Sequence, residues 1–347
     1  MDAFSNLVHD NCNGIVDEHS YINLMGKWYP NIQLNAVQPP LTVGPFTNMY
    51  ASFEQTETLS FPFVYADEAL SQAAQKKNIG LFLCGFGGDF TISHNGEDVV
   101  YELLKRGDFK QATSYFFSLK KHFQLSIFQS IVAFILSYSS IRHLHSFYQK
   151  HFKKKTKLPL TDKLLHAIEL KGRFGTSKTS STKENVMKMI NSGTIGSILF
   201  DSQVKISSHF ALECSSPILD KNISEFFLDV PEEQFYLDNK RRSLMRRAMA
   251  GIVPQEIQMR ESKGPFSPDF LIRVKLQTAY MKDVLNNIEL YKGKKYIDQT
   301  LLSNYLNKIE LSSDEMKIEN TANPRQAVWA IKLIFFVKWL EEKGYKM

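Results

Sequence analysis

The stretch Leu81-Phe82-Leu83-Cys84-Gly85-Phe86-Gly87-Gly88-Asp89 decides the fold, because an apolar run stops abruptly at glycines and then an aspartate. A run of this length that ends in glycine predicts a buried strand of a parallel sheet. Glycines directly after such a strand let the backbone approach a ligand and turn its N–H groups toward an anion. Asp89 adds a carboxylate for a metal-bound phosphate, since ligands bind at the carboxyl ends of parallel strands. The same pattern also suits an ordinary strand-to-helix turn.

The composition is that of a globular protein without disulfides. The 347 residues suffice for a large core or two domains, and 43% hydrophobic with 22% charged residues exclude a disordered chain. The net charge of +6 suits an anionic ligand, but we expect no nucleic-acid partner. The cysteines Cys12, Cys84 and Cys214 are far apart, which argues against a zinc site and fits a reducing cytoplasm. The first ten residues lack a signal-peptide pattern, so we expect a cytoplasmic protein.

One uncharged segment, residues 123–141, has about the length of a membrane span. It carries Gln124, Gln129 and five serines, each of which would need a hydrogen-bond partner in lipid. These residues favour a buried helix with the flanking lysines as a solvated rim. A peripheral membrane protein that binds through this segment stays open as an alternative.

The chain divides into three parts by its patterns. We expect a partial α/β nucleotide-binding core over 1–93, a basic helical insertion over 94–190 and a helical part over 191–347. In the first part we expect a short strand at 32–37. Helical spacing or composition is present at 17–25, 66–77, 99–104, 109–121 and 160–170, and an amphipathic helix is expected at 325–343.

The third part holds a second informative region. Asp220 is well placed as the N-cap of a helix over 221–228, and Gly251 as the C-terminal stop of an apolar helical face that begins at Leu244. Pro254 opens another short helix. Lys263 follows in a loop bounded by glycine and proline, which restrict the backbone around it. A lone lysine in such a loop is also an ordinary surface charge.

Together these stretches resemble the synthetase domain of the asparagine synthetase family, ligases that also include β-lactam synthetases and lasso-peptide cyclases. The strand end at 84–90 is similar to the family's S-G-x-G-[GA]-D-E, and residues 213–220 are similar to its E-x-R-x-P-F-L-D segment. Residues 244–254 match its leucine- and arginine-rich helix ending in G-x-x-P, and 260–267 its arginine-lysine loop. The four motifs occur in the family's order.

The resemblance implies an α/β protein with the parallel-sheet ATP-pyrophosphatase fold, N-terminally truncated, and a mostly helical C-terminal half. It implies ATP and Mg²⁺ as cofactors. Asp89 would lie on the Mg²⁺–pyrophosphate side, and Lys263 would be the catalytic cation that stabilises phosphate charge as the acyl-adenylate forms. The residues implied to contact ATP are Cys84, Gly85, Gly87 and Gly88.

Departures from the family pattern bear on function. The nucleotide loop S-G-G-x-D-S and a glutaminase domain occur nowhere in the 347 residues, and Phe86, Phe90 and Ser215 replace two acids and an arginine. Phe86 indicates a divergent branch, such as the lasso-peptide cyclases. We therefore expect a truncated or split ATP-dependent amide-forming ligase for a small-molecule or peptide carboxylate, with a separate chain supplying the nucleotide loop. The alternative is a catalytically inactive scaffold of the same fold that binds a peptide or partner protein.

Overall fold

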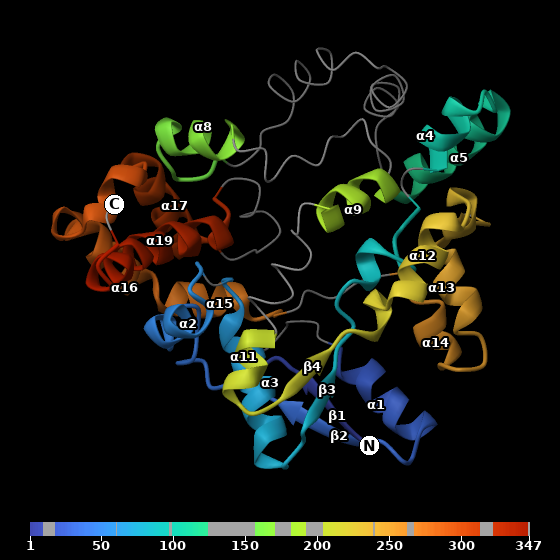
Figure 1. Ribbon diagram of the computed structural model, residues 1–347, viewed down its shortest axis with the longest axis horizontal. Helices are drawn as coiled ribbons and strands as arrows, with labels where there is room; N and C mark the ends of the chain where they lie inside the picture. The colour runs from blue at the N-terminus through green and yellow to red at the C-terminus, as the bar shows by residue number, and fades with distance from the viewer. Residues whose placement is uncertain are drawn as a thin grey trace.

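The computed structural model shows helices around short parallel strands (Figure 1). It describes residues 1–9, 18–59, 61–96, 99–123, 157–170, 182–191, 204–238, 240–261, 267–312 and 322–345. Residues 124–141, which make up all but the first residue of the uncharged segment, lie outside these ranges. None of the helices within them is long and apolar enough to cross a membrane.

Two parallel strand pairs form the α/β part of the molecule. Strand β1 (Asp2–Asn6) pairs with β2 (Gln33–Val37), with Asp2 opposite Gln33. Strand β3 (Leu81–Leu83) pairs with β4 (Glu213–Ser215), with Leu81 opposite Glu213. A short antiparallel hairpin joins β5 (Tyr236–Leu237) and β6 (Lys240–Arg241). The parallel pairs are consistent with an α/β protein, although β4 comes from the third part of the chain, where we expected a helical part.

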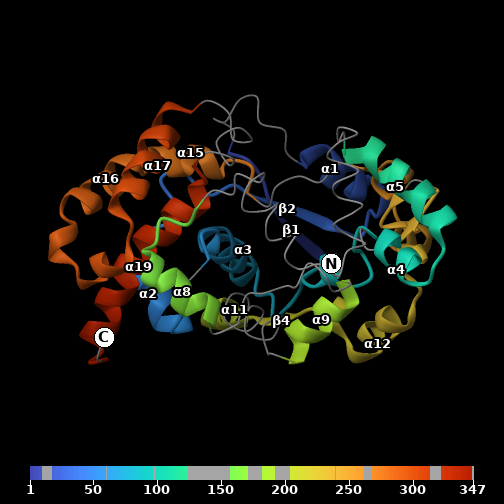
Figure 2. The ribbon, with the colours of Figure 1, turned by 90° about the horizontal axis from the view of Figure 1, so that it is seen from above.

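Helices connect the parallel strands, as parallel pairing requires. Helix α1 (His19–Trp28) leads from β1 to β2, and helices α2 (Met49–Thr56) and α3 (Val64–Lys76) lead from β2 to β3. Figure 2 shows α3 beside the strands. The expected strand at 32–37 and the expected helices at 17–25 and 66–77 are confirmed within a few residues. Strands β1 and β4 were not expected from sequence patterns.

Strand β3 is confirmed as a parallel strand, but its expected burial is wrong. The side chains of Leu81 and Leu83 are 51% and 60% exposed, while Phe82 between them is half-buried against Phe4 of β1, with ring centroids 5.8 Å apart. The two leucines project from one face of the narrow β3–β4 sheet, and no described element packs over them.

The main core lies between α2, α3 and the C-terminal helices. These are α15 (Phe270–Leu276), α16 (Thr278–Asn286), α17 (Gln299–Leu311) and α19 (Pro324–Glu342), with the short helices η5 (Ile288–Leu290) and η6 (Lys292–Tyr296) between α16 and α17. Residues 49–66 and 270–339 therefore share one core. Helix α19 is confirmed, but it is not amphipathic: its buried residues lie on all sides because α2, α15, α17 and η6 surround it.

The remaining helices carry smaller apolar clusters. Asp220 caps α12 as expected, accepting a hydrogen bond from the Asn222 N–H at 2.8 Å, and Gly251 has a positive φ of 74° after α13. The expected helices at 99–104, 109–121 and 160–170 are also present. The elements are η1 (Gly88–Phe90), α4 (Val99–Lys105), α5 (Phe109–Phe123), α8 (Asp162–Leu170), α9 (Thr182–Asn191), α11 (Lys205–His209), η3 (Pro217–Leu219), α12 (Lys221–Asp229), η4 (Glu232–Phe235), α13 (Ser243–Ala248) and α14 (Gln255–Gln258).

Candidate functional site

The glycine-rich turn directly follows β3 and is tied to the end of β4. The Cys84 N–H donates to the Ser215 carbonyl at 2.9 Å, and η1 begins four residues later. Gly87 has a φ of +94°, and a Cβ there would meet Leu219 Cδ2 at 2.3 Å, so this position requires glycine. A Cβ at Gly85 would meet nothing within 4 Å. The turn is thus packed at Gly87 and open at Gly85.

A cavity of about 310 Å³ lies beside the open part of the turn. Cys84, Gly85 and Phe86 form one wall. Helix α3 contributes Asp67, whose pKa is raised to about 7 by burial and by the negative charge that Cys84 can carry. The rest of the lining is Leu70, Ser71, Phe82, Ser207 and Cys214. The carboxyl end of β3 therefore opens into a small pocket of mixed polarity.

Two cysteine side chains meet in this cavity. The Cys84 Sγ lies 2.8 Å from the Ser216 Oγ, and the Cys214 thiol donates to the Cys84 Sγ at 3.9 Å. The hydrogen bond from Cys214, followed by that from Ser216, lowers the pKa of Cys84 to about 6 against the opposing effect of burial. Hydrogen bonding and burial raise the pKa of Cys214. The pair thus titrates as one unit, with the first proton leaving Cys84.

Asp89 lies on the surface, in the short helix η1 that ends the turn. Its side chain is 54% exposed, and its Oδ1 lies 3.4 Å from the Arg242 Nη2. Arg242 precedes α13 and also donates to the Asn95 side chain at 3.2 Å. The neighbouring Arg241 donates to the Glu261 carbonyl at 3.5 Å. Consecutive arginines thus link Asp89 to Glu261, two residues before Lys263, which itself lies outside the described residues.

The described residues on the N-terminal side of that loop are held by three contacts. Arg246 donates to the Arg260 carbonyl at 2.6 Å. The Arg260 side chain forms an ion pair with Glu18 at 2.9 Å and lies 4.1 Å from the Tyr21 ring centroid. Arg260 therefore lies beside the start of α1.

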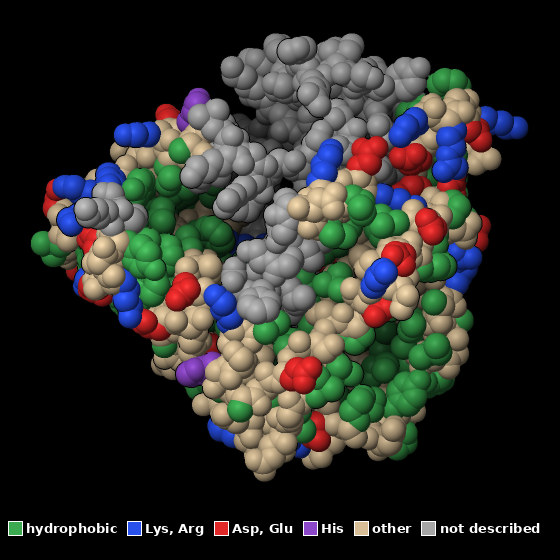
Figure 3. Space-filling model, in the orientation of Figure 1, with side chains coloured by type: hydrophobic (Ala, Val, Ile, Leu, Met, Phe, Trp, Pro, Cys, Tyr) green, Lys and Arg blue, Asp and Glu red, His purple; other side chains and the backbone are tan. Residues whose placement is uncertain are grey.

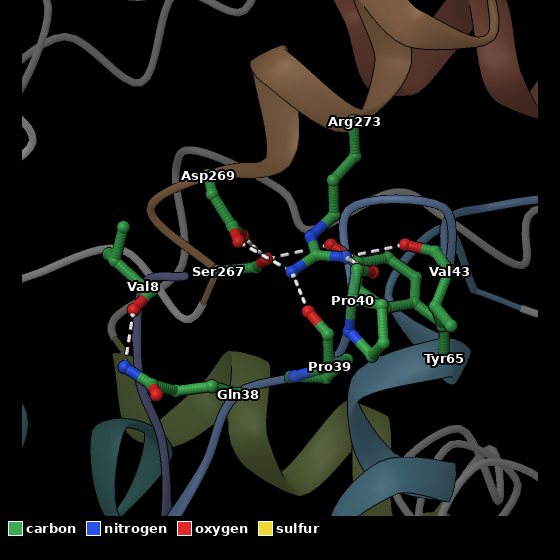
Figure 4. Close-up of polar contacts among 9 residues, drawn as sticks. All are labelled: Val8, Gln38, Pro39, Pro40, Val43, Tyr65, Ser267, Asp269 and Arg273. Carbon is green, nitrogen blue, oxygen red and sulfur yellow. Dashed lines mark hydrogen bonds and ion pairs between the residues drawn. The ribbon is translucent and has the colours of Figure 1, made fainter. Parts of the chain in front are cut away.

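The C-terminal side of the loop is held by a buried polar network (Figure 4). Ser267 contacts the Tyr65 hydroxyl at 2.7 Å and donates to Asp269 at 3.0 Å. Asp269 pairs with Arg273 at 2.6 Å, and Arg273, whose side chain is 1% exposed, also donates to backbone carbonyls of the segment after β2. Those acceptors are Pro39 at 2.9 Å, Pro40 at 2.7 Å and Val43 at 2.5 Å.

The described residues meet some of the requirements of a site for a nucleotide and its metal ion. The open backbone at Gly85 leaves room for a phosphate beside the cavity, and one exposed carboxylate, Asp89, suits Mg²⁺, which takes one or two carboxylates plus phosphate oxygens. No group of three His, Cys, Asp or Glu side chains in the described ranges can hold a metal by itself. A metal here would therefore depend on oxygens from its ligand.

The chain belongs to the asparagine synthase family, whose model matches residues 51–341. The match covers most of the chain and includes β3, the glycine turn, β4 and the described flanks of the 262–266 loop. The family has the ATP-pyrophosphatase fold and is associated with ATP-dependent ligase activity of the amide-forming type. No curated protein sequence matches the chain.

Several residues at the site were not expected from sequence. Cys214 and Ser216 belong to the 213–220 motif, but only the pairing of β4 with β3 brings them to Cys84. Arg242 and Asp67 had no sequence signal, since each meets its partner through tertiary contacts. The Asp269–Arg273 ion pair did have a sequence signal, because i,i+4 spacing places both side chains on one face of a helix.

Proposed function

We propose that this chain provides the synthetase part of an ATP-dependent amide-forming ligase. Such an enzyme adenylates the carboxylate of a small molecule or peptide and passes the acyl group to an amine. The observation that carries the proposal is the link from the glycine turn through Asp89, Arg242 and Arg241 to Glu261, two residues before Lys263. A carboxylate and a cation-bearing loop beside one strand end are what adenylation needs.

Each residue at the site would have a separate task. The open turn would hold the nucleotide through Cys84 and the three glycines Gly85, Gly87 and Gly88. Asp89 would hold Mg²⁺ and would have to exchange its contact with Arg242 for that ion. Lys263 would stabilise the charge that builds on the phosphates as pyrophosphate leaves.

The nucleotide loop S-G-G-x-D-S would have to come from residues outside these 347, and we propose that a separate chain supplies it. Strands β1 and β3 belong to different two-stranded sheets, and each has one edge to which no described strand is bonded. The Phe4 and Phe82 rings are in contact between them. Hydrophobic side chains gather at the lower right of Figure 3, where Figure 1 shows α1 and the N-terminus. A further parallel strand between β1 and β3 would bond to the open edge of each, and its end would lie beside the glycine turn.

Calorimetry with ATP and Mg²⁺ tests the role of the missing loop. We expect weak or absent binding by the 347-residue chain alone, because half of the backbone donors to the phosphates would be lacking. Addition of a polypeptide that carries S-G-G-x-D-S should restore binding and carboxylate-dependent release of pyrophosphate. Micromolar binding by the chain alone would overturn the need for the loop. A complemented complex that binds ATP but releases no pyrophosphate with any carboxylate offered would overturn the ligase.

Two variants of the complemented enzyme test the residue roles. Lys263→Ala should lower turnover much more than ATP affinity, because the lysine contact strengthens in the transition state. Lys221→Ala is the matched control, since that lysine is 83% exposed on α12. Asp89→Asn should weaken the dependence on Mg²⁺, whereas Asp162→Asn, which changes an exposed carboxylate on α8, should not.

A specific observation favours an inactive scaffold as the second candidate. Phe86 and Phe90, which stand where the family carries acids, contact each other with ring centroids 6.0 Å apart and pack with Leu219 against a buried cluster. Apolar side chains here suit the binding of a peptide or partner protein better than phosphate chemistry. The complementation experiment separates the two, because a scaffold would bind its partner without any release of pyrophosphate.

A further inference from the structure

The two cysteines among the described residues lie together at the β3–β4 strand pair. Cys84 follows β3 and Cys214 is the middle residue of β4, and hydrogen bonding between the two strands holds their side chains in the same cavity. Their sulfur atoms are 3.9 Å apart, and neither is in a disulfide. A disulfide needs a separation of about 2.05 Å, so the two side chains must move closer by rotation and a small backbone shift.

Cys84 has the environment of a reactive thiol. The Ser216 hydroxyl at 2.8 Å, the Cys214 thiol and the backbone N–H of Phe86 all stabilise its thiolate, which is the nucleophilic form. The ionisable group that faces it from α3 is Asp67, whose own pKa is raised by burial and by the charge of Cys84. Asp67 therefore carries less negative charge against the thiolate than an ordinary aspartate does.

The cavity gives a small reagent access to both sulfur atoms. It measures about 310 Å³, and Cys84 and Cys214 are each half-buried rather than enclosed. Its other polar lining groups are Asp67, Ser71 and Ser207. A molecule of the size and polarity of hydrogen peroxide fits such a space with hydrogen-bond partners on two sides.

We propose that Cys84 and Cys214 form a peroxide-reactive thiol pair, in which Cys84 is oxidised first and Cys214 resolves the product to a disulfide. In the first step the Cys84 thiolate attacks one oxygen of the peroxide: an S–O bond forms, the O–O bond breaks and hydroxide leaves. In the second step the Cys214 sulfur attacks the sulfenic acid: the S–S bond forms, the S–O bond breaks, and the Cys214 proton leaves with the hydroxide as water. Two thiols and one peroxide give one disulfide and two waters.

The expected rate advantage follows from the balance of two effects. A pKa of about 6 for Cys84 means that about half of it is thiolate at pH 6, against about 0.3% of an ordinary thiol with a pKa of about 8.5. The weaker intrinsic nucleophilicity of a low-pKa thiolate removes roughly tenfold of this difference. Cys84 should therefore react with peroxide about tenfold faster at pH 6 in the native chain than in the urea-unfolded chain, where all thiols are ordinary.

The test uses the full chain, hydrogen peroxide and dimedone, a trap for sulfenic acid. Wild-type protein and the control Cys12→Ser should both give a linked peptide containing Cys84 and Cys214 after digestion without reductant. Cys214→Ser should instead accumulate a dimedone adduct at Cys84, because the resolving thiol is absent. Cys84→Ser should give no disulfide and should lose the tenfold native-over-unfolded advantage.

Three results would overturn the proposal. The first is a disulfide in which Cys12 replaces either member of the pair. The second is a Cys84 that reacts no faster in the native chain than in the unfolded one. The third is a dimedone adduct at Cys84 that is as abundant in the wild type as in Cys214→Ser, since Cys214 would then not resolve it. None of these measurements depends on ligase activity, so the proposed function and this inference fail separately.

Discussion

Replacement of Arg273 by methionine should cause a large loss of stability. The guanidinium is 1% exposed and donates to the Asp269 carboxylate at 2.6 Å and to three backbone carbonyls of residues 39–43. Arg273→Met leaves Asp269, itself 3% exposed, with the Ser267 hydroxyl but without its cation. Removal of one partner of a buried ion pair costs about 3–5 kcal/mol, and the Pro39 and Val43 carbonyls, which lose the Arg273 N–H groups, favour the upper half of that range.

Urea unfolding followed by tryptophan fluorescence measures this loss, because Trp339 lies in the core beside the affected helices. Lys282→Met is the control: it breaks a pair with Glu310 at a similar distance of 2.6 Å, but on the surface, and should cost less than about 1 kcal/mol. The double variant Arg273→Met with Asp269→Leu should cost about 2 kcal/mol less than the sum of the single variants, since it leaves no unpaired charge.

The reasoning is refuted if Arg273→Met lowers the free energy of unfolding by no more than Lys282→Met does. Additive single variants would equally show that Arg273 and Asp269 do not act as a pair. The expected result would identify the segment after β2 and the start of α15 as one cooperative unit, which holds the described C-terminal flank of the 262–266 loop.

Three further predictions follow from single residues. Burial lowers the pKa of Lys332 from 10.5 to about 7, so the unfolded chain binds more protons than the folded chain between these pH values. The free energy of unfolding should therefore rise with pH across this window. Urea titrations at several pH values should show this rise for the wild type and not for Lys332→Met. Alkylation of Cys84 by iodoacetamide should be half-maximal near pH 6, because its thiolate forms above that pH, and a rate that climbs only above pH 8 would contradict the hydrogen-bonded environment. Gly96→Ala should lower the stability measured in thermal melts by about 2–4 kcal/mol, because φ is +71° and the new Cβ would lie 2.8 Å from the Tyr236 Cβ. Gly107→Ala, with φ +79° and open space around the new Cβ, should cost only the backbone strain of about 1 kcal/mol. Equal losses for the two variants would exclude the clash at Gly96.

The local elements were predictable because their signals are local. The apolar run before the glycines determined β3, Asp220 and Gly251 marked helix ends through their backbone chemistry, and the order of four motifs indicated the family that the match over residues 51–341 establishes. The turn at Gly87 was likewise predictable, since a backbone with a positive φ favours glycine in any context.

Burial and partnership depended on tertiary structure, because they arise between segments far apart in the chain. The pattern at 81–83 predicted a buried strand, yet burial depends on which distant elements pack over the faces of the sheet, and nothing described covers Leu81 and Leu83. Helix α19 has charged residues at amphipathic spacing, but surrounding helices bury even Lys332. Cys84 and Cys214 are 130 residues apart, and only the parallel register of β3 with β4 brings their sulfur atoms within 3.9 Å. A sequence specifies which side chains are available, while the packing of distant strands determines which of them meet.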